Sequence, residues 1–220
     1  MNNNYYKMNN DVPSITGLKL NEHMWWLFGL TVARLICMLP SMNGDSLNST
    51  LTNIILSIIA VINTIRLFKL SSYEYDYRKT AVWLVAYCIF KFVFTVTALI
   101  FLTAIDIGRG LTTILVIAII LESIVSNTLK AVSVYFCCKA HKELIGAENY
   151  SLCEKWSIFS IAYITSATII VLIEIINILL NTPKAMSSLA SAITVLISVS
   201  MLIFECVLLV MNANLCRKMK

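Results

Sequence analysis

Residues 111–137 read LTTILVIAIILESIVSNTLKAVSVYFC, an apolar stretch whose charged residues are Glu122 and Lys130. A helix needs about 20 mainly apolar residues to cross the ~30 Å hydrocarbon core of a bilayer, so this stretch is long enough to cross it with some tilt. The same criterion selects five further stretches of the chain, which are residues 24–40, 51–68, 81–104, 157–180 and 186–211. We therefore expect an all-α integral membrane protein, a bundle of six transmembrane helices.

The composition favours the same fold class. Of the 220 residues, 59% are hydrophobic and 13% are charged, and the mean hydropathy is +0.81. Soluble domains carry about 25% charged residues, so the chain lacks the charge that a water-facing surface needs. The loops are too short to bury a core of their own. We expect a polar N-terminal tail over residues 1–23, a transmembrane domain over residues 24–212 and a basic C-terminal tail over residues 213–220.

Lysine and arginine residues gather in alternate loops and thereby predict the orientation, because cytoplasmic loops retain these residues. They fill the loops after the second and fourth spans and the C-terminal tail: Arg66, Lys69, Arg78, Lys79, Lys139, Lys142, Lys155, Arg217, Lys218 and Lys220. The opposite loops contribute only Arg109 and Lys184. Both termini are therefore expected in the cytoplasm, and the protein in the plasma (cytoplasmic) membrane. This topology explains the net charge of +5, so we expect the lipid bilayer as a partner and no nucleic acid.

Six ionisable residues lie well inside the predicted spans: Arg34, Lys91, Glu122, Lys130, Glu174 and Glu205. A charge at the membrane centre costs a few kcal/mol even on lenient scales, so such residues usually face the bundle interior and pair. Alternating helix directions and a rise of about 1.5 Å per residue place one cation and one anion at each of three depths. The predicted pairs are Arg34 with Glu174, Lys91 with Glu122, and Lys130 with Glu205.

Polar side chains share one side of the fourth span, where a turn of about 100° per residue places them within about 140° of one another. They are Glu122, Ser123, Ser126, Asn127, Lys130 and Ser133. A side this polar cannot face lipid. The fifth span carries a similar set, which comprises Ser160, Tyr163, Glu174, Asn177 and Asn181. We therefore predict a polar centre between the third and sixth spans, with a binding site or path formed by Lys91, Glu122, Ser126, Asn127, Lys130, Glu174, Asn177 and Glu205.

Residue patterns typical of enzymes and metal sites are missing from the sequence. The two histidines, His23 and His141, flank the membrane near basic residues and lack the H-E-x-x-H spacing of a zinc site. We interpret His141 as a contact to lipid headgroups. The seven cysteines include no C-x-x-C pair and are interpreted as packing thiols. We expect no catalytic residue, no metal and no cofactor.

Small residues at the start of the sixth span allow close helix approach: Ser187, Ser188, Ser191 and Ala192. The connection to the fifth span is short, so the expected use of this face is packing inside the chain. The alternative is a contact with a protein partner or with a second copy of the chain.

Three functions remain open at this stage. The first is a transport or channel-type protein for a small solute or ion, whose path is the polar centre. The alternative is a non-catalytic accessory, sensor or immunity-type membrane subunit whose internal charges are structural, and the third is an intramembrane enzyme. The charge balance distinguishes the first two, because a fully paired set of charges can be dry and inert, whereas a path must admit water.

Overall fold

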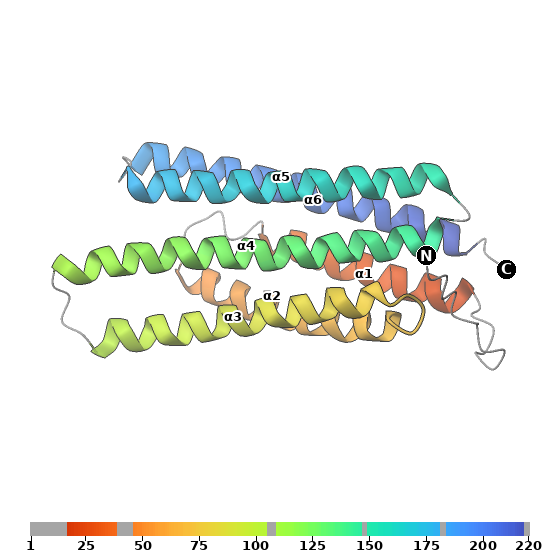
Figure 1. Ribbon diagram of the computed structural model, residues 1–220, viewed down its shortest axis with the longest axis horizontal. Coiled ribbons are helices and arrows are strands. Elements are labelled where there is room, and N and C mark those ends of the chain that lie inside the picture. The colour runs from red at the N-terminus through yellow and green to blue at the C-terminus, as the bar shows by residue number, and fades with distance from the viewer. Residues whose placement is uncertain (1–16, 39–45, 105–108, 147–148, 181–183, 218–220) are drawn as a thin grey trace, which may run out of the picture.

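The computed structural model describes residues 17–38, 46–104, 109–146, 149–180 and 184–217. Within these ranges the chain forms six α-helices and no β-strand (Figure 1). The helices are α1 (Gly17–Met38), α2 (Ser46–Leu70), α3 (Asp76–Ala104), α4 (Arg109–Ile145), α5 (Tyr150–Leu179) and α6 (Lys184–Cys216). The chain's three prolines all lie outside these helices, as expected for a residue that lacks the backbone N–H of a helical hydrogen bond.

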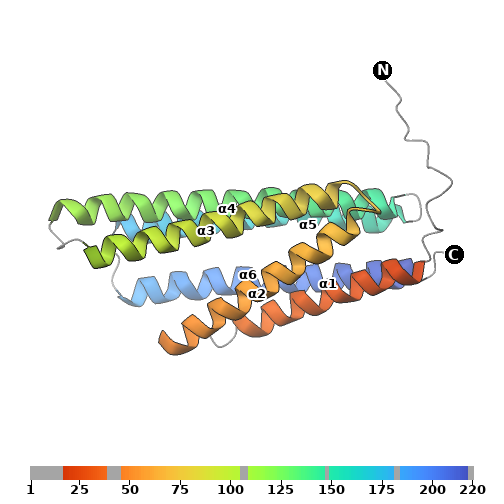
Figure 2. The same cartoon turned by 90° about the horizontal axis from the view of Figure 1, so that it is seen from below.

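The six described helices run alternately up and down and close into a ring. Each helix packs against its neighbours in sequence, and α6 returns to pack against α1. Figure 2 shows α3, α4 and α5 along one side of the bundle and α1 and α6 along the other, with α2 crossing between them. The start of α1 and the end of α6 lie at the same end of the bundle, together with the α2–α3 and α4–α5 connections (Figure 1).

Four helices are long and apolar enough to cross a membrane, judged on the described residues. These segments are Asp76–Ala98, Ile114–Ile145, Tyr150–Leu179 and Ser188–Cys216, with mean hydropathies of 1.8 to 2.6. The described part of α1 does not meet this criterion, because polar and charged residues interrupt its apolar run. In α2 the side chains are described over residues 55–70, a segment shorter than a membrane span. The prediction of an all-helical bundle is therefore confirmed, and its membrane-crossing character is supported for four of the six helices.

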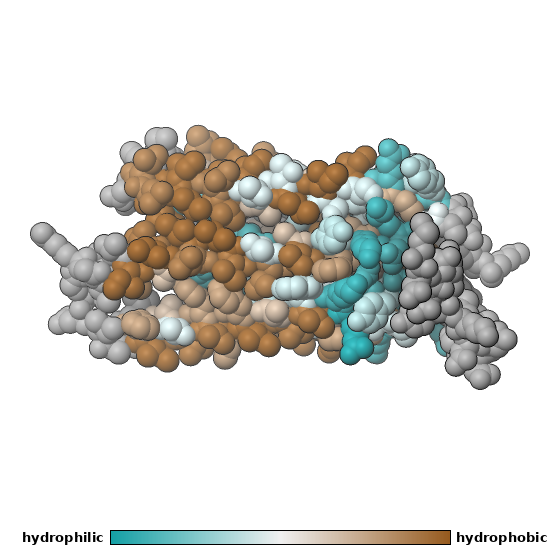
Figure 3. Space-filling view, in the orientation of Figure 1, coloured by the Kyte–Doolittle hydropathy of each residue, from teal (hydrophilic) through white to brown (hydrophobic). Residues whose placement is uncertain are grey.

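Large apolar side chains lie on the outside of the bundle, and several polar side chains lie inside it. Phe92, Ile161 and Leu196 are exposed, whereas Ser126 and Ser133 are buried. Apolar side chains cover most of the face shown in Figure 3, and polar ones gather at the end with the α2–α3 and α4–α5 connections. An exposed apolar surface of this extent suits lipid contact.

The helices extend beyond the spans predicted from hydropathy. Residues 17–23, expected to belong to a polar tail, form the first turns of α1, and α6 continues to Cys216. Likewise α4 runs to Ile145 and α5 starts at Tyr150. Hydropathy reports only the length of chain that suits hydrocarbon, whereas helical hydrogen bonds continue through polar residues at the membrane surface.

The most tightly packed core lies at the end of the bundle where these extensions meet. Leu70 ends α2, Ile145 ends α4, Leu152 lies in the first turn of α5 and Cys216 ends α6, and all four are buried. They belong to one cluster with the large aromatic side chain of Trp156. Close packing at this end holds the helices together in the region that the sequence assigns to the cytoplasmic surface.

The small residues at the start of α6 do not pack inside the chain as expected. Ser188, Ser191 and Ala192 are exposed, and the side chain of Ser187 lies outside the described residues. The other faces of α6 make its contacts with α1 and α5. The expectation of internal packing is therefore wrong for the three described residues, because the α5–α6 connection does not determine which face of α6 turns inward.

The connection between α4 and α5 uses two residues suited to helix ends. The Gly146 N–H donates to the Lys142 carbonyl oxygen at 2.7 Å, and a Cβ at Gly146 would lie 2.8 Å from that oxygen, which only glycine avoids. Asn149 caps α5, because its side-chain oxygen accepts a hydrogen bond from the Leu152 N–H at 3.1 Å. This cap satisfies one of the unpaired N–H groups at the start of the helix.

We expect Asn149→Ala to lower the free energy of unfolding by about 1 kcal/mol, because it removes this cap. The measurement is thermal unfolding of the purified chain in detergent. Asn149→Ser, which retains a capping oxygen, should stay close to the wild type. Equal losses for the two variants would show that the cap contributes nothing.

Candidate functional site

A polar face runs along α4 through the inside of the bundle. Residues at positions 122, 126, 130, 133, 137 and 141 repeat every three or four positions and so share one side of the helix. Ser123, Ser126 and Ser133 are buried, which confirms that this side turns towards the interior of the bundle. From Glu122 to His141 the face covers about 28 Å at a rise of about 1.5 Å per residue, close to the ~30 Å of a bilayer core.

The predicted pair of Lys91 and Glu122 is present. The Lys91 ammonium on α3 forms an ion pair with the Glu122 carboxylate on α4, and Ser126 Oγ donates to Glu122 Oε1 at 2.9 Å. The Glu122 side chain is 13% exposed and that of Lys91 44%, so the carboxylate is the buried partner. The two helices are neighbours in the ring, which places residues of equal depth beside each other.

The other two predicted pairs are not formed. Glu174 accepts a hydrogen bond from Ser123 Oγ, and Asn127 Nδ2 donates to the Ser123 carbonyl oxygen at 2.9 Å. The expected Arg34–Glu174 and Lys130–Glu205 ion pairs are therefore corrected: neither occurs among the described residues. For Arg34 and Glu174 the reason is the helix order, because α1 packs against α2 and α6 rather than α5. Lys130 and Glu205 line the same cavity, but no ion pair joins them.

These unmatched charges surround a cavity at the centre of the ring. The cavity has a volume of about 180 Å³, and residues of all six described helices line it. A second cavity of about 80 Å³ adjoins it, and the two share the walls Arg34, Met38, Lys130, Tyr163 and Glu205. Two basic residues and one acidic residue therefore line the same space.

Lys130 has an aromatic neighbour in place of a carboxylate. Its Nζ lies 4.9 Å from the centroid of the Tyr87 ring, a cation–π contact between α4 and α3. Within the described ranges, no carboxylate forms an ion pair with Lys130 or with Arg34. The predicted site residues include Lys130 but neither Arg34 nor Tyr87. The signal for Arg34 was present, since arginine is rare inside a span.

The predicted site residues divide between this cavity and the contacts beyond it. Asn127, Lys130 and Glu205 line the cavities. Four others take part in the ion pair and hydrogen bonds nearer the start of α4: Lys91, Glu122, Ser126 and Glu174. Asn177 is half-buried on α5, one turn beyond Glu174. Whether these residues form a path stays a prediction.

His141 also lines the cavity, and it belongs to a buried network of hydrogen bonds. The Trp156 Nε1–H donates to Asn212 Oδ1 at 3.0 Å, and Asn212 Nδ2 donates to His141 Nδ1 at 2.9 Å. The Tyr77 hydroxyl lies 2.8 Å from the same nitrogen, and the imidazole stacks on the Trp156 ring with centroids 4.2 Å apart. The interpretation of His141 as a headgroup contact is therefore wrong, because its side chain is buried between four helices.

The direction of these hydrogen bonds defines the protonation state of His141. An indole N–H can only donate, so the oxygen of the Asn212 amide faces Trp156 and its NH₂ group faces His141. Nδ1 must then accept, which requires a neutral imidazole with its proton on Nε2. The Tyr77 hydroxyl, which shares this acceptor, donates as well. The network contributes no charge to the cavity wall.

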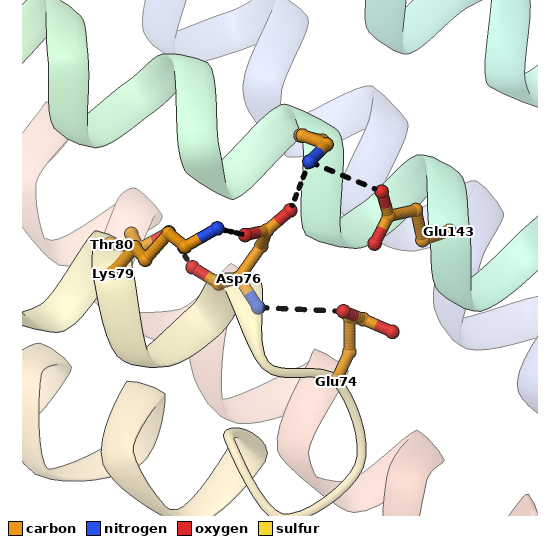
Figure 4. Close-up of polar contacts among 6 residues, drawn as sticks. Glu74, Asp76, Lys79, Thr80 and Glu143 are labelled. Atoms are coloured by element: carbon orange, nitrogen blue, oxygen red, sulfur yellow. Dashed lines mark hydrogen bonds and ion pairs between the residues drawn. The ribbon is translucent and has the colours of Figure 1, made fainter. Parts of the chain in front are cut away.

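A cluster of charged residues lies beyond this network, at the end of the bundle (Figure 4). Asp76 binds two ammonium groups, with Lys79 Nζ at 2.6 Å and Lys139 Nζ at 2.9 Å, and Lys139 also lies 3.4 Å from Glu143. Carboxylate oxygens of Glu74, Asp76 and Glu143 come within 4.8 Å of one another. Burial, together with the neighbouring Glu143 carboxyl, raises the pKa of Glu74. The two lysines pair with Asp76 and Glu143, so the cluster is an ion-pair network that joins α3 to α4.

Comparison with known proteins adds no relative, since no protein-family model, curated protein sequence or solved structure matches the chain significantly. The fold and the interior define a helical bundle with four helices able to cross a membrane and a charged central cavity. The function must therefore be argued from the geometry of that cavity.

We expect Lys91→Met to lower the free energy of unfolding by about 3 kcal/mol, because it leaves the buried Glu122 carboxylate unpaired. Glu122→Gln should cost less, because the Lys91 side chain that it leaves unpaired is 44% exposed. The double substitution should cost clearly less than the sum of the two. Reversible unfolding in mixed detergent measures all three values. Additive costs would show that the two side chains do not interact.

We expect Trp156→Phe to lower the free energy of unfolding by about 1–3 kcal/mol, because Asn212 Oδ1 is then left buried without a donor. Trp83→Phe makes the same change at an exposed position on α3 and should be close to neutral. Thermal unfolding of both variants tests the comparison. A smaller effect at Trp156 than at Trp83 would contradict the role of the network.

Proposed function

We propose that the chain is a six-span membrane protein of the transport or channel type, which takes a small polar solute or ion into its central cavity. The observation that carries the proposal is the set of Arg34, Lys130 and Glu205 around one space, without an ion pair among them within the described ranges. A purely structural set of charges should be paired, because a buried unpaired charge costs several kcal/mol.

The cavity wall also favours the presence of water. Asn63 Oδ1 is buried, accepts no hydrogen bond from a described residue, and belongs to a side chain that lines the cavity. Buried polar atoms of this kind normally bind ordered water. A volume of about 180 Å³ accommodates several water molecules. Hydration of the space would stabilise Arg34 and Lys130 as charged groups.

The proposal includes an orientation. The α2–α3 and α4–α5 connections, with the basic residues around them, face the cytoplasm, and both termini lie on that side. The polar surface at this end of the bundle supports this placement (Figure 3). In this orientation the His141 network and the packed core would lie between the cavity and the cytoplasm.

A second candidate function is an accessory or sensor subunit. It is favoured by the Lys91–Glu122 pair and by the Asp76 network, in which charges satisfy one another inside the chain and need no solute. Such pairs hold helices in register without any transport. The two candidates differ in whether water reaches the cavity wall.

Thiol accessibility tests this difference with matched positions on two helices. Asn127→Cys and Ser198→Cys place a thiol on the cavity wall, whereas Thr128→Cys and Ser200→Cys place one on the neighbouring exposed surface. We expect a small water-soluble thiosulfonate to label the first two in membranes and to spare the second two, which face lipid. Mass spectrometry of the digested protein locates each label among the native cysteines.

Labelling of neither cavity position would show that the cavity is dry and would favour the accessory function. Equal labelling of all four positions would show that the exposed surfaces are in water, which would overturn the membrane placement itself.

A further inference from the structure

We propose that the central cavity binds a small oxyanion, held between Arg34 of α1 and Lys130 of α4. This inference rests on the proposed function, because it names the class of solute for the same cavity. The ligand we infer is a short-chain carboxylate.

The first argument is the charge around the cavity. Among the described residues that line the two cavities, Arg34 and Lys130 are basic and Glu205 is the single acidic residue. His141 also lines the larger cavity, but it is neutral because its Nδ1 accepts a hydrogen bond from Asn212. One carboxylate can balance one of the two cations. The described residues of the wall therefore carry a net charge of +1.

The second argument concerns the groups available to balance the second cation. A guanidinium group stays ionised in proteins, so Arg34 requires a counter-charge wherever it is removed from water. Lys130 has the face of the Tyr87 ring at 4.9 Å, which attracts a cation more weakly than a carboxylate does. A ligand anion would supply the missing charge at the point where Arg34 and Lys130 line the same space.

The third argument is the kind of hydrogen-bonding groups on the wall. The guanidinium offers five N–H donors in a planar fork, which matches the two oxygens of a carboxylate, and the ammonium offers three more. The Tyr163 side chain also lines both cavities and carries a hydroxyl donor. The unpartnered Asn63 Oδ1 on the same wall can accept a hydrogen bond from a hydroxyl of the ligand.

The fourth argument is size. A cavity of about 150 Å³ in a protein interior can hold a benzene molecule, which has six carbon atoms. The larger cavity here measures about 180 Å³, so it accommodates a carboxylate of about six non-hydrogen atoms. A hydroxycarboxylate such as lactate fits this limit and offers a donor for Asn63. Gluconate has the same functional groups but about twice as many non-hydrogen atoms as this limit allows.

The test compares these two anions on the full chain, purified in an uncharged detergent. Sodium lactate should raise the thermal unfolding temperature in a saturable manner, and sodium gluconate at equal ionic strength should not. Equal effects of the two salts would overturn the proposal, because they would show a general salt effect. Equilibrium dialysis of the wild-type protein with labelled lactate measures the same binding directly and needs no variant.

Two variants locate the site. Lys130→Met should weaken the apparent affinity for lactate at least tenfold, whereas Lys69→Met, which removes a lysine outside the cavity, should leave it unchanged. In lactate-free buffer Lys130→Met should unfold at the same temperature as the wild type or higher, because it removes a cation without a counter-charge. Unchanged lactate affinity in Lys130→Met would overturn the assignment to this cavity.

A lipid headgroup phosphate presents similar oxygens and is the other source of an oxyanion. Nanodiscs of phosphatidylglycerol and of phosphatidylcholine distinguish it. If only phosphatidylglycerol stabilises the protein, and only while Lys130 is present, the oxyanion site stands with a lipid as its ligand. If lactate stabilises the protein in phosphatidylcholine, the free carboxylate is the ligand.

Uptake of labelled lactate into proteoliposomes separates this inference from the proposed function. Saturable binding without uptake would leave the anion site in place and reject transport. Labelling of the cavity thiols by the water-soluble reagent, without lactate binding, would retain a hydrated cavity and overturn the anion site.

Discussion

The polar face of α4 must find partners inside the ring of helices, and much of the described interior follows from this requirement. Lipid cannot satisfy a carboxylate, an ammonium or an imidazole, so each polar group on this face needs a neighbour on another helix. Glu122 forms an ion pair with Lys91 on α3. Ser123 forms a hydrogen bond with Glu174 on α5, and His141 forms one with Asn212 on α6. These contacts fix how α4 is rotated, and its neighbours are held around it.

The interior is not uniform along this face. At the end with the α2–α3 and α4–α5 connections, buried aromatic and aliphatic side chains pack around the His141 network. Near the middle, Arg34, Lys130 and Glu205 surround the cavity instead. The described interior therefore combines a packed end with a charged wall around the cavity.

Depth along the bundle axis and position around the ring differ in how well the sequence predicts them. Residue counting from the span ends gives depth, and it paired Lys91 with Glu122 correctly, because α3 and α4 are joined by a short connection and lie side by side. The same counting failed for Arg34 and Glu174, since equal depth does not make α1 and α5 neighbours. Lys130 and Glu205 line one cavity, yet no ion pair joins them among the described residues, so equal depth does not ensure contact there either.

The sequence by itself determined the six helices, the apolar character of their outer surfaces and the inward direction of the α4 polar face. These properties depend on hydropathy and periodicity, which are local and can be read from consecutive residues. Only the tertiary structure decided that His141 is buried, with partners 64 and 71 positions away in the chain, and that Arg34 and Lys130 line one cavity. The physical reason is that helix order around a ring is set by the packing of all six helices together, and no local pattern encodes it.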